Sequence, residues 1–143
     1  MLIGINQNTS GLLRAIRSNG CLFLCFANES PIVFEGSVGI KVLNALWEAA
    51  KDSGVINRDD ELVDHNALAN NFFGLKLKYD GEHHDAYEDI PEDVAFIIGK
   101  FVWKFGHFVI INRDKKVIFD PLVKSNSVQY GALQSMRWYY HAN

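Results

Sequence analysis

The sequence predicts an α+β fold in which helices of the N-terminal half pack on an antiparallel β-sheet formed by the C-terminal half. Two observations lead to this expectation. Apolar residues recur at helical spacing up to about residue 73, and after it they alternate or form short runs separated by polar turns. Helices followed by a run of strands are typical of the α+β class. The 143 residues suffice for one core, so we expect a single domain over 1–143.

Composition narrows the protein class. Apolar residues make up 48% of the chain and charged residues 22%, as in ordinary globular proteins, and the net charge of −3 favours neither nucleic acid nor an anionic membrane as a partner. The first residues lack a basic segment, and no apolar run approaches the roughly 20 residues that span a bilayer. Two cysteines are too few for a disulfide framework. We expect a cytoplasmic protein with reduced thiols.

A first helix is expected over residues 8–18, where a short apolar stripe follows the potential caps Thr9 and Ser10. The pair Asn19-Gly20 is a stop signal, and Gly20 suits a left-handed position after the helix. The apolar run 21–27 follows at once and is expected to be buried. We favour a helix, capped by Asn19, although seven residues are too few for periodicity to exclude a strand.

Two more helices are expected before the sheet. Residues 37–53 have apolar side chains at helical spacing, and Gly54 would end that helix. Residues 59–73 form a second helical pattern, with Gly74 as its stop.

The sheet is expected to begin with the alternating residues 75–79 and to continue with 94–104, where Gly99 suggests a β-bulge. Between them, residues 80–93 carry seven carboxylates and read as a surface loop. The last expected elements are a connector at 123–127, a short pairing segment at 128–131 and an aromatic strand at 136–140.

A β-hairpin is expected between these strands. The apolar runs 108–111 and 117–119 flank a polar turn at 112–116. If the turn is centred between residues 113 and 114, His107 lies directly opposite Asp120, with Cβ atoms about 4.5–5.5 Å apart. At that distance a carboxylate can accept a hydrogen bond from the imidazole and orient it as a base.

Cys21 is the candidate nucleophile for this pair. It follows a glycine and would occupy the first turn of a buried helix, where backbone N–H groups and the helix dipole favour a thiolate. His107 would be the general base, Asp120 would fix its tautomer, and the Cys21 N–H could contribute to an oxyanion hole. Each residue alone is more often a packing residue, and Cys25, one turn later, is expected to be one.

These residues resemble the papain-like cysteine peptidase superfamily. Three segments carry the resemblance: Asn19-Gly20-Cys21, Gly106 to Ile110 and Phe119-Asp120-Pro121. Together with the rest of the two ends of the chain, it covers about half of the sequence. The nearest likeness is to its small prokaryotic branch, related to bacteriocin-leader peptidases. Three segments of the tail are similar to uncharacterised small proteins of phages and plasmids in that branch: Asp120 to Ser125, Val128 to Gly131 and Met136 to Tyr140.

The resemblance implies a papain-like domain with Cys21, His107 and Asp120 as the catalytic triad. Such an enzyme is a thiol hydrolase, a peptidase or amidase that acts on a peptide or protein substrate through an acyl-enzyme and needs no cofactor. In a phage-associated protein, cross-linked cell-wall peptides would be a candidate substrate.

The sequence departs from the family pattern upstream of the cysteine. The superfamily usually places a glutamine five or six residues before it, where Ile16 and Ala15 stand here. Asn19 or Gln7 is the candidate replacement as oxyanion donor. A degenerate, non-catalytic binding module or a phage accessory protein is therefore the alternative function.

Two other features concern the surroundings of this site. The adjacent His83 and His84 lie in the acidic segment, where we expect a solvated surface and no metal site, and the segment could instead wall a cleft for basic substrates. Trp103, just before the histidine strand, is a further candidate for the cleft wall.

Overall fold

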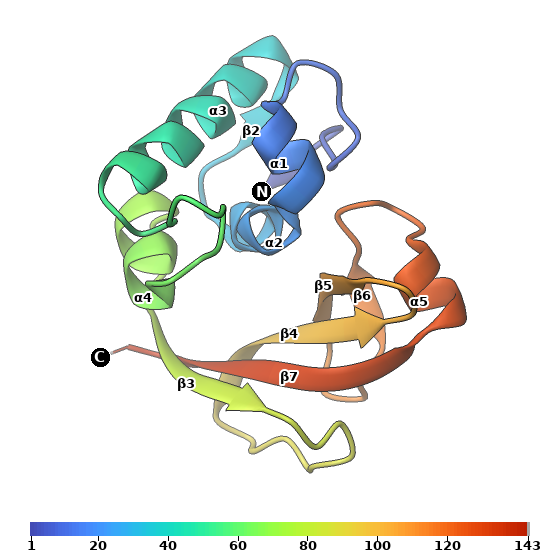
Figure 1. Cartoon of the computed structure of the whole chain (residues 1–143). Coiled ribbons are helices and arrows are strands. Elements are labelled where there is room, and N and C mark those ends of the chain that lie inside the picture. The colour runs from blue at the N-terminus through green and yellow to red at the C-terminus, as the bar shows by residue number, and fades with distance from the viewer. Residues whose placement is uncertain (143) are drawn as a thin grey trace. The chain divides into compact units, whose positions relative to one another are not determined.

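The computed structural model describes residues 1–142 and divides into two compact units, residues 1–76 and a second unit that begins at Leu77. The first unit is largely helical, and the second contains a five-stranded antiparallel sheet (Figure 1). The predicted α+β class is therefore confirmed. In the described part of the chain, no helix is both long and apolar enough to cross a bilayer.

Short strands and helices alternate in the first unit. Its two strands pair in parallel, and its elements are β1 (Leu2–Ile3), α1 (Arg14–Asn19), α2 (Cys21–Glu29), β2 (Phe34–Glu35), α3 (Gly36–Asp52), α4 (His65–Ala67) and the π-helix η1 (Leu68–Phe72). Phe23 of α2 packs edge-on against Trp47 of α3 and against Phe73, with ring centroids 5.1 and 5.0 Å apart. These aromatic contacts join α2, α3 and the end of η1 in one core.

Helix α2 confirms the expected buried helix and extends it to Glu29. Residues 22–27 are all buried, which explains why the run has no polar face. Its N-cap is Gly20 rather than Asn19, and no side chain caps it. The expected left-handed Gly20 is also wrong, because its φ is −91°. Glycine is needed there since an added Cβ would lie 2.5 Å from the carbonyl oxygen of Ile16.

Helix α1 is shorter than the predicted 8–18. Gly11 has a left-handed φ of +96°, which interrupts helical geometry. Asn44 of α3 then accepts a hydrogen bond from the N–H of Leu13 and donates one to the carbonyl of Gly11. A side chain distant in the sequence thus holds this segment as a turn.

Helix α3 and its end at Gly54, with φ +81°, match the prediction. The helix predicted over 59–73 begins only at His65, where Asp64 caps it by accepting from the N–H of Ala67. The preceding residues form a turn, because the Asn57 side chain accepts hydrogen bonds from two downstream N–H groups.

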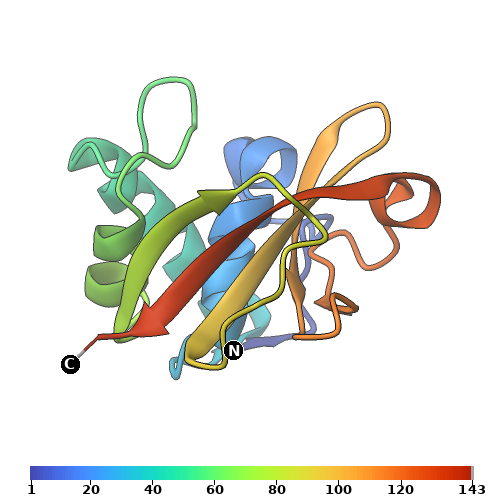
Figure 2. The ribbon, with the colours of Figure 1, turned by 90° about the horizontal axis from the view of Figure 1, so that it is seen from below.

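In the sheet of the second unit, three consecutive strands form a meander, and the last strand of the chain returns to pair beside them. The elements of this unit are β3 (Leu77–His83), β4 (Val94–Val102), β5 (Gly106–Ile111), β6 (Val117–Phe119), α5 (Asn126–Tyr130) and β7 (Ala132–His141). The order β3-β7-β4-β5-β6 places the last strand between β3 and β4, as Figure 2 shows. One face of the sheet carries a buried apolar cluster of Val94, Ile97, Val109, Ile111, Met136 and Trp138.

Three expectations for this unit are corrected. Strand β3 continues to His83, into the segment expected to be a loop. Gly99 is not a bulge: it pairs with Val109 and with Met136, and an added Cβ would lie 2.9 Å from the Leu133 side chain. Residues 128–131, expected to pair as a strand, belong mostly to α5, because Ser125 caps this helix through the N–H of Val128.

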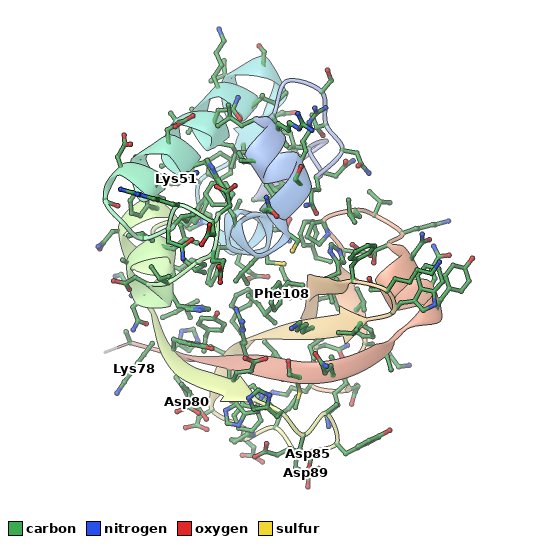
Figure 3. The ribbon with its side chains drawn as sticks, in the orientation of Figure 1. Lys51, Lys78, Asp80, Asp85, Asp89 and Phe108 are labelled. Atoms are coloured by element: carbon green, nitrogen blue, oxygen red, sulfur yellow. The ribbon has the colours of Figure 1, made fainter. Side chains whose placement is uncertain are left out.

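The loop of residues 84–93 is fastened to the tip of the β5–β6 hairpin. Arg113 donates to the carbonyls of Pro91 and Val94, each at 2.6 Å, and also to that of Glu92. Lys115 donates to the carbonyl of Ala86 at 2.6 Å. Asp85 and Asp89 lie at the outer end of this loop (Figure 3).

Candidate active site

His107 and Asp120 are hydrogen-bonded in the second unit. The His107 Nε2 lies 2.7 Å from the Asp120 Oδ1, and the two side chains are only 7% and 6% exposed. The contact expected between them is therefore present.

The register that produces this contact differs from the expected one. The loop has three residues rather than two: Asn112 pairs with Lys116 across it, and Lys115 is left-handed with φ +64°. The register shifts again within β6: Ile111 pairs with Val117, but Ile110 pairs with Phe119, so Ile118 has no partner residue in β5. Each change shifts the register by one residue. Because side chains alternate with a period of two, the combined shift keeps Asp120 on the same face as His107.

Asp120 is held by hydrogen bonds on both carboxylate oxygens. Oδ1 also accepts from the N–H of Leu122, and Oδ2 accepts from the N–H of Ser125, each at 2.9 Å. Burial alone would raise the pKa of Asp120. The hydrogen bonds from His107, from the Ser125 side chain and from these two backbone groups outweigh burial and hold the pKa well below its usual range.

The ionised state of Asp120 defines the tautomer of His107. A carboxylate can only accept hydrogen bonds, so the proton of this contact belongs to Nε2 of the imidazole. In the neutral ring, Nδ1 then carries the lone pair and is the nitrogen that would act as a base.

Cys21 is the first residue of α2 in the first unit, and its side chain is partly exposed. Cys25 is fully buried, in keeping with a packing role. The first N–H groups of α2 have no partner within the helix, which is the arrangement that favours negative charge at a helix start. The candidate nucleophile thus belongs to one unit, and the candidate base and its orienting carboxylate belong to the other.

Of the two candidate oxyanion donors, Gln7 is buried and Asn19 is exposed. Gln7 is 3% exposed, and its side-chain amide donates to the carbonyls of Ile16 and Arg17 at 3.4 and 3.1 Å. The chain therefore does fold back over α1, but these two carbonyls engage the amide hydrogens of Gln7. Its Oε1 is buried without a hydrogen-bond partner among the described residues. Asn19 is the exposed last residue of α1.

Trp103 lies in the turn between β4 and β5 and is 44% exposed. Its ring contacts that of Tyr130 at 5.4 Å between centroids, and the Lys104 Nζ lies 4.7 Å from its centroid. Trp103 therefore belongs to an exposed aromatic group, and its role as a cleft wall stays a prediction.

His83 packs within the sheet unit. Its ring stacks on Trp138 at 3.5 Å between centroids, and its two nitrogens lie 3.1 Å from Asp80 and 3.4 Å from Glu88. No group of three or more His, Cys, Asp or Glu side chains within residues 1–142 has an arrangement that could hold a metal ion.

Ser125 is the residue at this site that sequence reasoning missed. It donates to Asp120 from its backbone and side chain and caps α5 at the same time. The segment was expected to be a plain connector. The signal that could have identified Ser125 is a serine in N-cap position before a short helical stretch.

The comparisons with known proteins identify a family. A family model described as "Protein of unknown function, DUF261" matches residues 1–141. No curated protein and no solved structure matches the chain. Because the family match covers nearly the whole length, the chain belongs to the DUF261 family.

Proposed function

We propose that this protein is a thiol hydrolase, a peptidase or amidase, in which Cys21 is the nucleophile, His107 the general base and Asp120 the orienting carboxylate. The observation that carries the proposal is the buried His107–Asp120 hydrogen bond of 2.7 Å. It holds the imidazole in the tautomer whose Nδ1 can take a proton, which is the requirement for a base paired with a thiol.

The proposed reaction has two steps. The Nδ1 of His107 takes the Cys21 proton, the sulfur attacks the substrate carbonyl carbon, and the resulting imidazolium gives its proton to the leaving amine as the C–N bond breaks. Water then attacks the carbonyl carbon of the thioester and gives a proton to His107; the C–S bond breaks, the acid product leaves, and His107 returns the proton to the sulfur of Cys21. The ionised Asp120 stabilises the imidazolium during both steps.

The oxyanion of each tetrahedral intermediate needs backbone or side-chain donors. The N–H of Cys21, at the start of α2, is the first candidate. Gln7 would have to release the carbonyls of Ile16 and Arg17 before its amide could serve as a second donor.

A non-catalytic binding module is the second candidate function. It is favoured by the residues Ala15 and Ile16 where a peptidase of this kind usually has glutamine, and by the engaged amide of Gln7. In that case the site would hold a protein partner without cleaving it.

Alkylation by iodoacetamide tests the enzyme hypothesis. In a Cys25→Ser variant, we expect Cys21 to react near neutral pH at least about tenfold faster than free cysteine, because only an activated thiol is largely thiolate there. The reaction is followed by mass spectrometry. The matched Cys21→Ser variant reports on Cys25, which should react slowly because it is buried. A Cys21 no faster than free cysteine would favour the binding module.

A further inference from the structure

An exposed aromatic patch lies on the second unit, in the β4–β5 turn and at the end of α5. It consists of Trp103, Phe105 and Tyr130, which are 44%, 80% and 64% exposed, together with Lys104. The contact of Trp103 with both Tyr130 and Lys104 keeps these side chains together. Clustered exposed aromatic residues of this kind are typical of protein recognition surfaces.

The aromatic patch is also basic. The two chain segments that carry it, residues 100–108 and 122–131, contain three lysines and no aspartate or glutamate, in a chain with a net charge of −3. Lys104 and Lys124 are exposed. A complementary partner would therefore carry carboxylates close to an aromatic side chain.

The loop of residues 84–93, the acidic loop, has this chemistry. It holds five carboxylates and no lysine or arginine. Tyr87 at its tip is 92% exposed. A turn that begins at Asp85 holds Tyr87 in this exposed position. The Asp85 side chain accepts a hydrogen bond from the N–H of Tyr87 at 2.9 Å, and the Asp85 backbone carbonyl accepts one from the N–H of Glu88.

The acidic loop is pre-organised and kept apart from the aromatic patch of its own chain. Arg113 and Lys115 fasten it to the hairpin tip beyond one end of β5. The aromatic patch adjoins the other end of this six-residue strand, a separation of roughly 20 Å. A loop fixed in this way loses little conformational entropy when it binds.

We propose that the acidic loop of one copy docks on the aromatic patch of a second copy of this chain. Opposite charges would attract the two surfaces, and Tyr87 would pack against Trp103 and Phe105. Because the two surfaces are separated along β5, an antiparallel pair related by a twofold axis forms both contacts at once and closes as a dimer. This inference is independent of the proposed hydrolase function.

Sedimentation velocity on the full chain tests the proposal, over concentrations up to about 1 mM and at NaCl on the order of 0.05 M and 0.5 M. We expect a concentration-dependent dimer at low salt whose dissociation constant rises at least about tenfold at high salt, because screening weakens the contact. A larger species with the same salt dependence would show the same contact in an open chain. A monomer at every concentration would overturn the proposal.

Single substitutions at exposed positions locate the interface. Lys104→Glu in the aromatic patch and Asp89→Lys in the acidic loop should each weaken association about tenfold, and so should Tyr87→Ser. Mixing the Lys104→Glu and Asp89→Lys proteins should restore association, because the mixed dimer has one contact with the original charges and one with the charges exchanged, and both are attractive. Lys41→Glu on α3, an exposed lysine of the first unit, is the matched control and should leave association unchanged. Association that none of the three interface variants weakens would contradict the proposed surfaces, and near-UV circular dichroism verifies that each variant is folded.

Discussion

Asp120 accepts hydrogen bonds from His107 and Leu122 on one oxygen and from Ser125 on the other. These contacts join the start of β5, the turn after β6 and the start of α5. A single side chain thus links three segments of the second unit.

The charge of Asp120 should make the stability of the protein depend on pH. Its folded-state pKa lies below its unfolded value of about 3.9, so the carboxylate stabilises the fold fully above that value, and the contribution is lost as the pH falls towards the folded pKa. We expect Asp120→Asn to lower the free energy of unfolding by about 1.5–3 kcal/mol at neutral pH, the range for hydrogen bonds to charged groups.

Urea unfolding from pH 7 down to below pH 4 measures this effect. The difference between Asp120→Asn and the unmodified protein should shrink in acid, because Asp120 then takes up a proton when the unmodified protein unfolds. Asp114→Asn, an exposed position in the hairpin loop, is the control and should change stability by less than about 0.5 kcal/mol. A constant difference across the pH range would contradict this assignment.

At the scale of elements, the tip of the β5–β6 hairpin also holds the loop of residues 84–93 in place, which its sequence does not indicate. An arginine in a polar turn reads as an exposed charge, yet Arg113 donates to three backbone carbonyls around the loop of residues 84–93. The hairpin that carries His107 is therefore hydrogen-bonded to this loop through Arg113.

Arg113→Ala should release the loop. The guanidinium satisfies backbone carbonyls of Pro91, Glu92 and Val94, so its loss should increase amide exchange in this segment at least about tenfold. Hydrogen–deuterium exchange with mass spectrometry measures this change. Lys116→Ala in the same turn is the matched control. Unchanged exchange in both variants would show that the clamp contributes little to the order of the loop.

At the scale of the whole molecule, the proposed enzyme requires residues from both units. Cys21 comes from the helical unit, and His107 comes from the sheet unit. The proposed catalytic site therefore needs the complete chain, because neither unit contains both Cys21 and His107.

A substitution in the sheet unit should change the chemistry of the thiol in the helical unit. His107→Ala is expected to slow alkylation of Cys21 by at least about tenfold near neutral pH, because the imidazole would no longer take the thiol proton. His141→Ala, at the exposed end of β7, controls for loss of a histidine. Equal rates in the three proteins, with the fold intact, would argue that Cys21 and His107 do not form a catalytic pair.

The sequence by itself determined the elements whose signals are local. Helix α3 has apolar residues at helical spacing and a left-handed glycine after it, and the run that forms α2 is apolar on every side. The hairpin has two apolar runs around a polar turn, and both runs form strands, β5 and β6. These features follow from periodicity and turn chemistry within a few residues.

Only the tertiary structure decided the features that depend on distant partners. Asn44 shortens α1 from a different helix, and Arg113 fastens a loop about twenty residues upstream. The side chains of such residues look like ordinary solvated polar groups in the sequence. Their roles arise because a folded chain must satisfy buried carbonyls, N–H groups and carboxylates with whichever donors and acceptors the fold brings near them.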